Sequence, residues 1–178
     1  MGRVTAGDVA ALAIRTGLGA TLFAHGSQKL FGWFSGGGLD GTAGGFHGMG
    51  YRPGKPMATA AGLSETAGGA ALVLGLGTPA GGAAVAGTMG VAAEMHSPNG
   101  FFNQQGGLEY PALVGLSALA LVAQGPGRIS LDQVTGHVLD RPWMRYAAMA
   151  AVIPAVGLVV ARKKSELAKD ATEREAAS

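Results

Sequence analysis

Residues 57–96 read MATAAGLSETAGGAALVLGLGTPAGGAAVAGTMGVAAEMH, and this stretch decides the fold. It contains two apolar segments of helical length, residues 57–76 and 80–95, joined by Gly77-Thr78-Pro79. Proline cannot continue the helix before it but fits the first turn of the next one, so the stretch is predicted to form a helical hairpin. Its acidic residues are Glu65 and Glu94, and it contains no Lys or Arg.

Small residues lie in stripes along this hairpin. Ala83, Gly87, Gly90 and Glu94 share one face of the second helix, and Gly68-Gly69 follows Glu65 by one turn on the first. Small residues let helix backbones approach closely in a lipid environment. Both stripes are therefore predicted to be helix-packing surfaces.

Further apolar segments flank the hairpin, at residues 9–34, 108–123 and 146–161. Between them lie a Gly-rich segment (35–56), a polar loop (97–107) and an amphipathic stretch (128–145). Several apolar segments are short against the roughly 17–25 residues that cross a bilayer, but their polar ends can extend them. We expect a four-helix membrane domain at 1–132, an amphipathic connector with a fifth helix at 133–161, and a polar charged tail at 162–178.

Composition supports a membrane protein. Hydrophobic residues make up 48% of the 178 residues and charged residues 13%, about half the share typical of soluble domains. The 32 glycines lie within apolar stretches rather than in a polar linker. The expected fold class is therefore an all-α integral membrane four-helix bundle with a fifth transmembrane helix near the C-terminus.

Composition also excludes several functions. The net charge is +2 and the basic residues are dispersed apart from Arg162, Lys163 and Lys164, so no nucleic-acid partner is expected. The absence of cysteine excludes disulfides, thiol chemistry by this chain, and Cys-ligated zinc or iron–sulfur clusters. No closely spaced pair such as His-x-x-x-His is present, so no metal site is predicted.

Polar residues within the apolar segments are predicted to gather near one membrane side. Because successive helices alternate in direction, a rise of roughly 1.5 Å per residue places His25 and Glu65 at matching depth, roughly 12–13 Å from that side. Lys29 lies one turn from His25, on the same helix face. The candidates for handling a ligand or protons are His25, Lys29, Glu65, Glu94, His96 and Glu109.

Charges buried in a bilayer are costly and therefore rare, and they usually serve a function. A ligand- or proton-handling site is one interpretation of this cluster, and a structural ion pair that fixes helix register is the other. Arg15 lies alone in the opposite half of the bundle, as a structural or lipid-contacting residue. Most of the aromatic residues fall near the polar cluster, and we expect residues 35–56 and 97–107 to form a lid over it.

The motifs that carry a family resemblance are Arg15-Thr-Gly-Leu-Gly, Phe23-Ala-His-Gly-Ser-Gln-Lys-Leu-Phe-Gly-Trp-Phe34, Glu65 with Gly68-Gly69 and Leu74-Gly-Leu-Gly-Thr-Pro79, His96 with Asn99-Gly-Phe-Phe102, Gly106-Gly-Leu-Glu-Tyr-Pro111, and Gly125-Pro-Gly-Arg-Ile-Ser-Leu-Asp132. In their order and spacing these motifs resemble the DoxX family over residues 10–132. The motif residues among the candidates are Arg15, His25, Lys29, Glu65, His96 and Glu109.

The resemblance implies a multi-pass protein of the bacterial inner membrane that is associated with redox systems and oxidative stress. Members resemble a subunit of the quinone-reducing thiosulfate oxidoreductase, and a mycobacterial relative is linked to a membrane complex with superoxide dismutase and a sulfurtransferase. We therefore expect a membrane subunit of an oxidoreductase system that binds a quinone or another small redox-active molecule. A redox protein partner would supply electrons, in an oligomer or a larger membrane complex. No residue is assigned as catalytic.

Two alternatives remain at this point. The chain would be a non-catalytic scaffold or assembly subunit if the charged residues only lock the bundle. It would be a carrier for a small solute or a lipid if the polar pocket serves transport.

Overall fold

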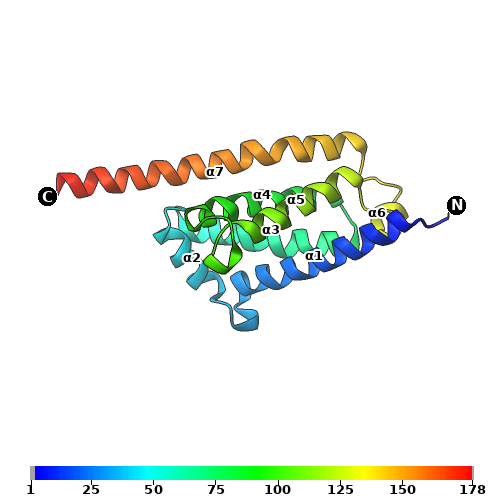
Figure 1. Ribbon diagram of the computed structural model, residues 1–178, viewed down its shortest axis with the longest axis horizontal. Helices are drawn as coiled ribbons and strands as arrows, with labels where there is room; N and C mark the ends of the chain where they lie inside the picture. Colours follow the sequence, from blue (N-terminus) through cyan, green and yellow to red (C-terminus); the bar gives the residue numbers. More distant parts are fainter. Residues whose placement is uncertain (1–2, 178) are drawn as a thin grey trace.

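The computed structural model describes residues 3–177, which form helices with no β-strand among them (Figure 1). Four long helices make an up-and-down bundle: α1 (Ala6–Phe31), α3 (Gly54–Leu74), α4 (Thr78–His96) and α5 (Glu109–Gln124). The short helices α2 (Gly38–Gly48) and α6 (Leu131–Val134) lie in the connections. The long α7 (Pro142–Ala176) runs along the side of the bundle against α4 and α5. The all-α prediction is confirmed, and each of the five expected apolar segments corresponds to one long helix.

The start of α1 is set by a capping box. Thr5 Oγ1 accepts a hydrogen bond from the Asp8 backbone N–H at 3.2 Å, and Asp8 Oδ2 accepts one from the Thr5 backbone N–H at 2.8 Å. These bonds satisfy backbone donors that the first helical turn leaves without partners. Asp8 Oδ1 also accepts the backbone N–H of Arg128 at 2.8 Å, which ties α1 to the segment that follows α5.

Glycines set the closest helix contacts in the bundle. A Cβ atom on Gly69 would lie 2.5 Å from the carbonyl oxygen of Gly19 on α1. A Cβ on Gly68 would lie 3.0 Å from the carbonyl oxygen of Gly81 on α4. Any larger residue would push these backbones apart, so the packing surface predicted at Gly68-Gly69 is confirmed.

The small-residue stripe of α4 packs against another helix at Gly90 but not at Gly87. A Cβ on Gly90 would lie 2.8 Å from the side chain of Val156 on α7, whereas a Cβ on Gly87 would meet no atom within 4 Å. The prediction of a continuous packing surface is therefore wrong at Gly87. The reason is that α3 and α4 are in close contact at Gly68 and Gly81, near their connecting turn, and leave open space beside Gly87.

We expect Gly90→Leu to destabilise the folded protein, because the larger side chain must displace Val156 and with it α7. Overpacking of this kind costs about 1–3 kcal/mol. Gly87→Leu is the matched control, since it adds the same atoms to the same helix where there is room for them. Thermal unfolding in detergent should show a lower midpoint for Gly90→Leu only, and an unchanged midpoint for that variant would show that α7 does not pack on this face.

The C-terminal part of α7 is fastened to the connection between α2 and α3. The Leu167 side chain lies against Gly50, and Arg52 donates two hydrogen bonds to Asp170, at 2.6 and 2.8 Å. The hydrogen bonds from Arg52 lower the pKa of the Asp170 carboxyl below its ordinary value. We call this contact, formed by Gly50, Arg52, Leu167 and Asp170, the C-terminal clamp. The polar segment expected as a tail is thus helical and held in place.

Two connections differ from their expected form. Residues 35–56 contain α2, although this segment is rich in glycine, because the helix packs against α1 and α3. Tertiary packing overrides the low helix propensity of glycine there. The amphipathic stretch 128–145 contains only the four-residue α6 and the first turn of α7.

Of the described helices, α1 and α7 are long and apolar enough to cross a membrane, and α5 is a shorter apolar helix. The helices α3 and α4 do not reach the same hydropathy, because glycine, serine and threonine occupy many of their positions.

Candidate functional site

A cavity of about 670 Å³ lies between the separated parts of α3 and α4. Residues of α1 and α5 also line it, as do alanines and valines of α7. Most of the lining is apolar. The ionisable lining residues come from α1, α3, α4, α5 and the α2–α3 connection, and they are His25, Lys29, Tyr51, Glu65, His96 and Tyr110.

Lys29 and Glu65 form an ion pair within this lining. Lys29 Nζ on α1 lies 2.6 Å from Glu65 Oε2 on α3. The Glu65 side chain is 3% exposed and that of Lys29 is 26% exposed, so the carboxylate is nearly removed from solvent while the ammonium group is not. A carboxylate so deeply buried needs a charged partner to remain ionised, and Lys29 is that partner.

Two histidines also face the cavity. The His25 ring lies 6.0 Å from the Tyr110 ring between centroids, and no described residue hydrogen-bonds to its nitrogens. His96 Nδ1 lies 2.8 Å from the carbonyl oxygen of Gly106, so Nδ1 donates and Nε2 is left as an acceptor in the neutral ring. Both imidazoles can therefore exchange hydrogen bonds or protons with a ligand.

Glu94 lies behind the cavity wall rather than in it. Tyr51 donates a 2.6 Å hydrogen bond to Glu94 Oε2, and Lys163 of α7 donates to both carboxylate oxygens, at 2.9 and 3.1 Å. Lys163 also lies 5.0 Å from the Tyr51 ring centroid. Burial and the hydrogen bond to Glu94 raise the pKa of the Tyr51 hydroxyl, which stays protonated. Glu94 thus joins α7 to Tyr51, and Tyr51 is the side chain that a ligand would meet.

Glu109 holds a loop. Its Oε2 accepts the backbone N–H of Asn103 at 3.0 Å, within the segment that connects α4 to α5. Asn103 and Gly107 of that segment line the cavity, and Glu109 does not. The structure therefore brings His25, Lys29, Glu65 and His96 to one cavity. Glu94 and Glu109 lie outside it and hydrogen-bond to the lining residues Tyr51 and Asn103.

Arg15 is buried at the opposite end of the bundle. Its Nη1 donates to the carbonyl oxygens of Leu72 and Val73, at 3.1 and 2.9 Å, and its Nη2 donates to that of Ile129. The last carbonyls of α3 have no partner within the helix, and the guanidinium group provides one. At 1% exposure Arg15 has little surface to offer a lipid.

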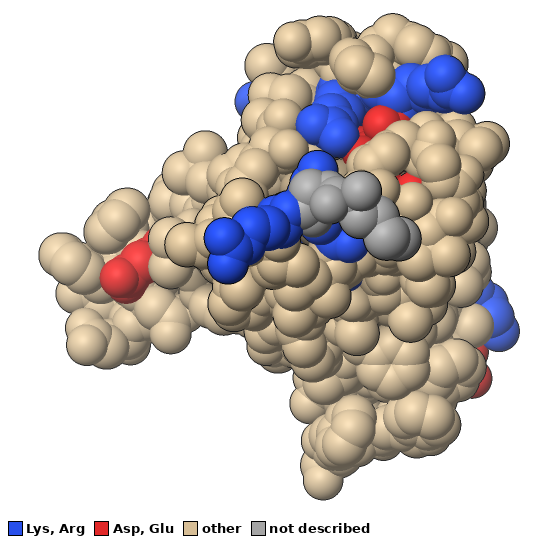
Figure 2. Space-filling model, turned by 90° about the vertical axis from the view of Figure 1, so that its right-hand side faces the viewer, with Lys and Arg blue, Asp and Glu red and all other residues tan. Residues whose placement is uncertain are grey.

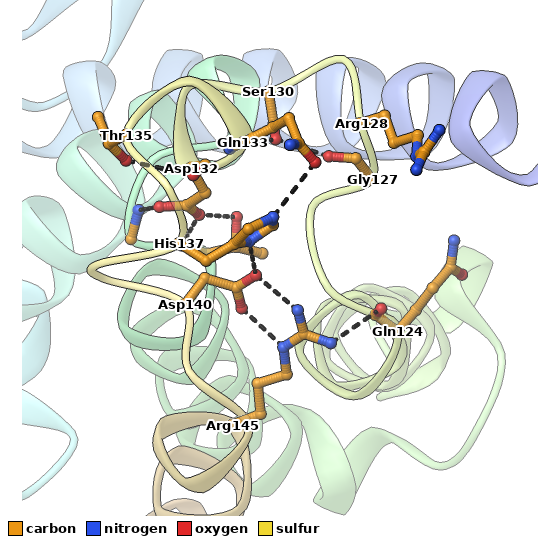
Figure 3. Close-up of polar contacts among 12 residues, drawn as sticks. Gln124, Gly127, Arg128, Ser130, Asp132, Gln133, Thr135, His137, Asp140 and Arg145 are labelled. Atoms are coloured by element: carbon orange, nitrogen blue, oxygen red, sulfur yellow. Dashed lines mark hydrogen bonds and ion pairs between the residues drawn. The ribbon is translucent and has the colours of Figure 1, made fainter. Parts of the chain in front are cut away.

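A second polar network, which the sequence patterns did not indicate, lies at this end of the bundle (Figure 3). Asp132 accepts hydrogen bonds from the backbone of Gly77 and from the backbone and hydroxyl of Thr78, at 2.8–3.1 Å, and so caps α4. Asp140 binds Arg145 through two contacts, at 2.7 and 2.5 Å, and His137 at 3.0 Å. The motif that ends at Asp132 was the available signal. The same end carries exposed arginines (Figure 2), namely Arg3, Arg128 and Arg141.

The aromatic lid is only partly as expected. Phe46, Tyr51 and Tyr110 line the cavity, but many of the other aromatics point outward. The exposed ones in the two connections and at the end of α1 are Phe31, Trp33, Phe34, Phe101 and Phe102. They pair with one another, as Phe31 with Trp33 and Phe101 with Phe102, rather than covering the polar cluster. Among residues 3–177, no three His, Asp or Glu side chains gather closely enough to hold a metal ion.

The model of one protein family matches residues 10–98, which is half of the chain and includes α1, α3, α4 and most of the polar cavity lining. That family is DoxX. The chain belongs to the DoxX family. DoxX proteins form a membrane family associated with oxidoreductase-related functions, so this protein is a membrane protein. The DoxX match ends at Pro98, and the resemblance suggested as far as Asp132 stays a prediction beyond that point. No curated protein and no solved structure matches the chain.

Proposed function

We propose that α1, α3, α4 and α5 cross the inner membrane of a bacterium as a four-helix bundle and that α7 crosses beside them. The length and hydropathy of α1 and α7 support this, and α3, α4 and α5 lie alongside these two helices. Large apolar side chains are exposed on the outer faces of α3, α5 and α7, including Leu63, Leu116 and Ile153. Exposed apolar surface of this extent is unfavourable in water and favourable in lipid.

This arrangement places residues 35–56 and 97–107 on the same side of the membrane, because two crossings separate them. Single-cysteine variants Ser35→Cys and Ser97→Cys are expected to react with an impermeant thiol reagent from the same side of sealed vesicles. The chain has no cysteine of its own, so the labelling has no background from this protein. Labelling from opposite sides would show that the number of crossings between them is odd.

Within the membrane the protein acts as a subunit of an oxidoreductase system and binds a quinone headgroup or a similar small redox-active molecule. The observation that carries this proposal is an apolar cavity that contains His25 beside the Lys29–Glu65 pair. Ligand sites are typically apolar cavities of about 300–1,000 Å³ with a few converging polar groups. A quinone headgroup is a flat ring with two carbonyl acceptors, which suits donors such as Lys29, His25 and Tyr110.

The side chains also suit the chemistry of quinone reduction, which consumes two electrons and two protons. A histidine can donate a proton at neutral pH, and a carboxylate can take up a proton and pass it on. His25 and Glu65 line the same cavity. The electrons come from a redox protein partner, which would assemble with this subunit in a larger membrane complex.

Binding of menadione, a quinone without a side chain, tests the proposal. The wild-type protein in nanodiscs is expected to enrich menadione over empty nanodiscs of the same lipid. Gly87→Leu is expected to reduce this enrichment about tenfold or more, because Gly87 lines the cavity and a Cβ atom there would meet no other atom within 4 Å, so the leucine fills cavity space. Wild-type protein that shows no enrichment would refute quinone binding at this site.

The alternative with a specific observation in its favour is a non-catalytic scaffold. The direct contact of Lys29 with Glu65 is what a structural lock between α1 and α3 would require. The scaffold and the quinone-binding subunit differ in the menadione binding expected once the charges of Lys29 and Glu65 are both removed.

A further inference from the structure

The cavity wall that α7 contributes is apolar, unlike the part of the lining that contains His25, Lys29 and Glu65. It is made of small apolar residues, Ala148, Ala151, Val152, Ala155, Val156 and Val159. Opposite it on α3 lie Met57, Ala60 and Ala61. The part of the cavity between α3 and α7 is therefore an apolar trough that continues from the site of His25 and Glu65 without a barrier, because both belong to one cavity.

This trough reaches the surface of the molecule. α7 packs against α4 and α5, and within the described residues it makes no comparable contact with α3. Ala60, Ala151 and Ala155 line the cavity and are nevertheless exposed. An alanine can line the cavity and also be exposed only where the cavity reaches the molecular surface. The gap between α3 and α7 is therefore an opening. Under the proposed arrangement of the helices, that opening faces the hydrocarbon of the bilayer.

The end of the cavity near α2 is covered instead. Tyr51 is 2% exposed and lines the cavity there, and Glu94 and Lys163 hold it from behind. The C-terminal clamp holds α7 over the same connection through Arg52 and Asp170. This end is thus held by ionic and hydrogen-bonded contacts, whereas the walls beside the lateral opening consist of apolar side chains.

We infer that the ligand is an amphiphile with a long apolar chain, which enters from the bilayer between α3 and α7 and leaves its chain in the trough. The polar headgroup reaches His25 and the Lys29–Glu65 pair, and the chain lies along Ala151 and Ala155. This inference rests on the proposed function for the nature of the headgroup. It adds that the substrate is a lipid-soluble, chain-bearing quinone and that α7, which lies outside the region matched to the family, selects for the chain.

The test compares menadione with phylloquinone, which carries a phytyl chain on the same ring. Each is supplied at equal mole fraction in phosphatidylcholine nanodiscs, and the readout is its enrichment over empty nanodiscs. Ala151→Phe places a ring in the trough, whereas Ala150→Phe, one residue away on the same helix, is outside the cavity lining. We expect Ala151→Phe to lower the enrichment of phylloquinone about tenfold and to preserve that of menadione, and Ala150→Phe to preserve both. Both alanines are exposed, so both variants are expected to fold. Thermal unfolding of each variant checks this.

The outcomes separate this inference from the function on which it rests. Wild-type protein that enriches menadione but not phylloquinone overturns the inference and leaves the headgroup site in place. The inference is equally overturned if Ala151→Phe changes the two quinones alike, or changes neither. Wild-type protein that enriches neither quinone overturns the proposed function together with the inference.

Discussion

Replacing Lys29 with methionine is expected to destabilise the bundle by about 3–5 kcal/mol, because it leaves the buried Glu65 carboxylate without its partner. The double variant Lys29→Met with Glu65→Gln removes both charges and should recover most of this loss, since a buried ion pair is often replaceable by neutral groups of similar shape. Thermal or denaturant unfolding in detergent measures both effects. A single variant as stable as the wild type would show that the pair contributes no stability.

The same double variant distinguishes a purely structural ion pair from a ligand-binding site. If the pair only fixes the register of α1 and α3, the refolded double variant should enrich menadione as well as the wild type does. Our proposal expects a folded double variant whose enrichment is lower by about tenfold or more, because the donor and the proton-bearing group are both gone. Glu65→Gln alone is the informative companion, since it retains the shape and hydrogen bonding of the side chain. Fully folded and fully active Glu65→Gln protein, assayed with its redox partner, would end the proposal that this carboxylate takes part in chemistry.

The second large effect is expected at the opposite end of the bundle, for Arg15→Met. The substitution removes the donor of the Val73 and Ile129 carbonyl groups and leaves the Leu72 carbonyl with the Gly75 backbone N–H alone. A hydrogen bond from a charged group contributes about 1.5–3 kcal/mol to stability, so the loss of these bonds is expected to cost several kcal/mol and leave little folded protein. Hydrogen exchange near the turn between α3 and α4 should rise first, because Arg15 joins that turn to the segment before α6.

Arg128→Met is the matched control, since Arg128 is an exposed arginine at the same end. A substitution at such a position usually changes stability by less than about 0.5 kcal/mol. If Arg15→Met folded as well as Arg128→Met, the capping role of Arg15 would be excluded.

The helices themselves were predictable because their signals are local. The hairpin of α3 and α4 follows from two apolar runs around Gly77-Thr78-Pro79, and α4 does begin at Thr78 with the proline in its first turn. Simple geometry placed His25 at the depth of Glu65 and Lys29 one turn away, whereas the structure pairs Glu65 with Lys29. Neighbouring antiparallel helices with a fixed rise bring residues of equal depth to the same level, and the long side chain of Lys29 covers the remaining distance of one turn.

Contacts made by the chain after residue 130 were not predictable in the same way. Glu94 looked like a member of the polar cluster, and only the position of α7 pairs it with Lys163, 69 residues away. Gly87 and Gly90 belong to one stripe in the sequence, yet one faces open space and the other faces Val156. Asp132 appeared as part of a motif, and its role in capping α4 depends on the path of a connection with almost no regular structure.

The sequence by itself determined the five long apolar helices, their order, the membrane character that the family match supports, and the part of the bundle in which His25, Lys29 and Glu65 gather. These depend on short-range periodicity, on turn chemistry and on the cost of burying charge, all of which can be read from neighbouring residues. The tertiary structure alone decided where α3 and α4 separate, which face α7 covers, and hence the shape and opening of the cavity. Those features depend on the angles at which helices pack, and such angles are set by the sum of many small contacts between residues far apart in the chain.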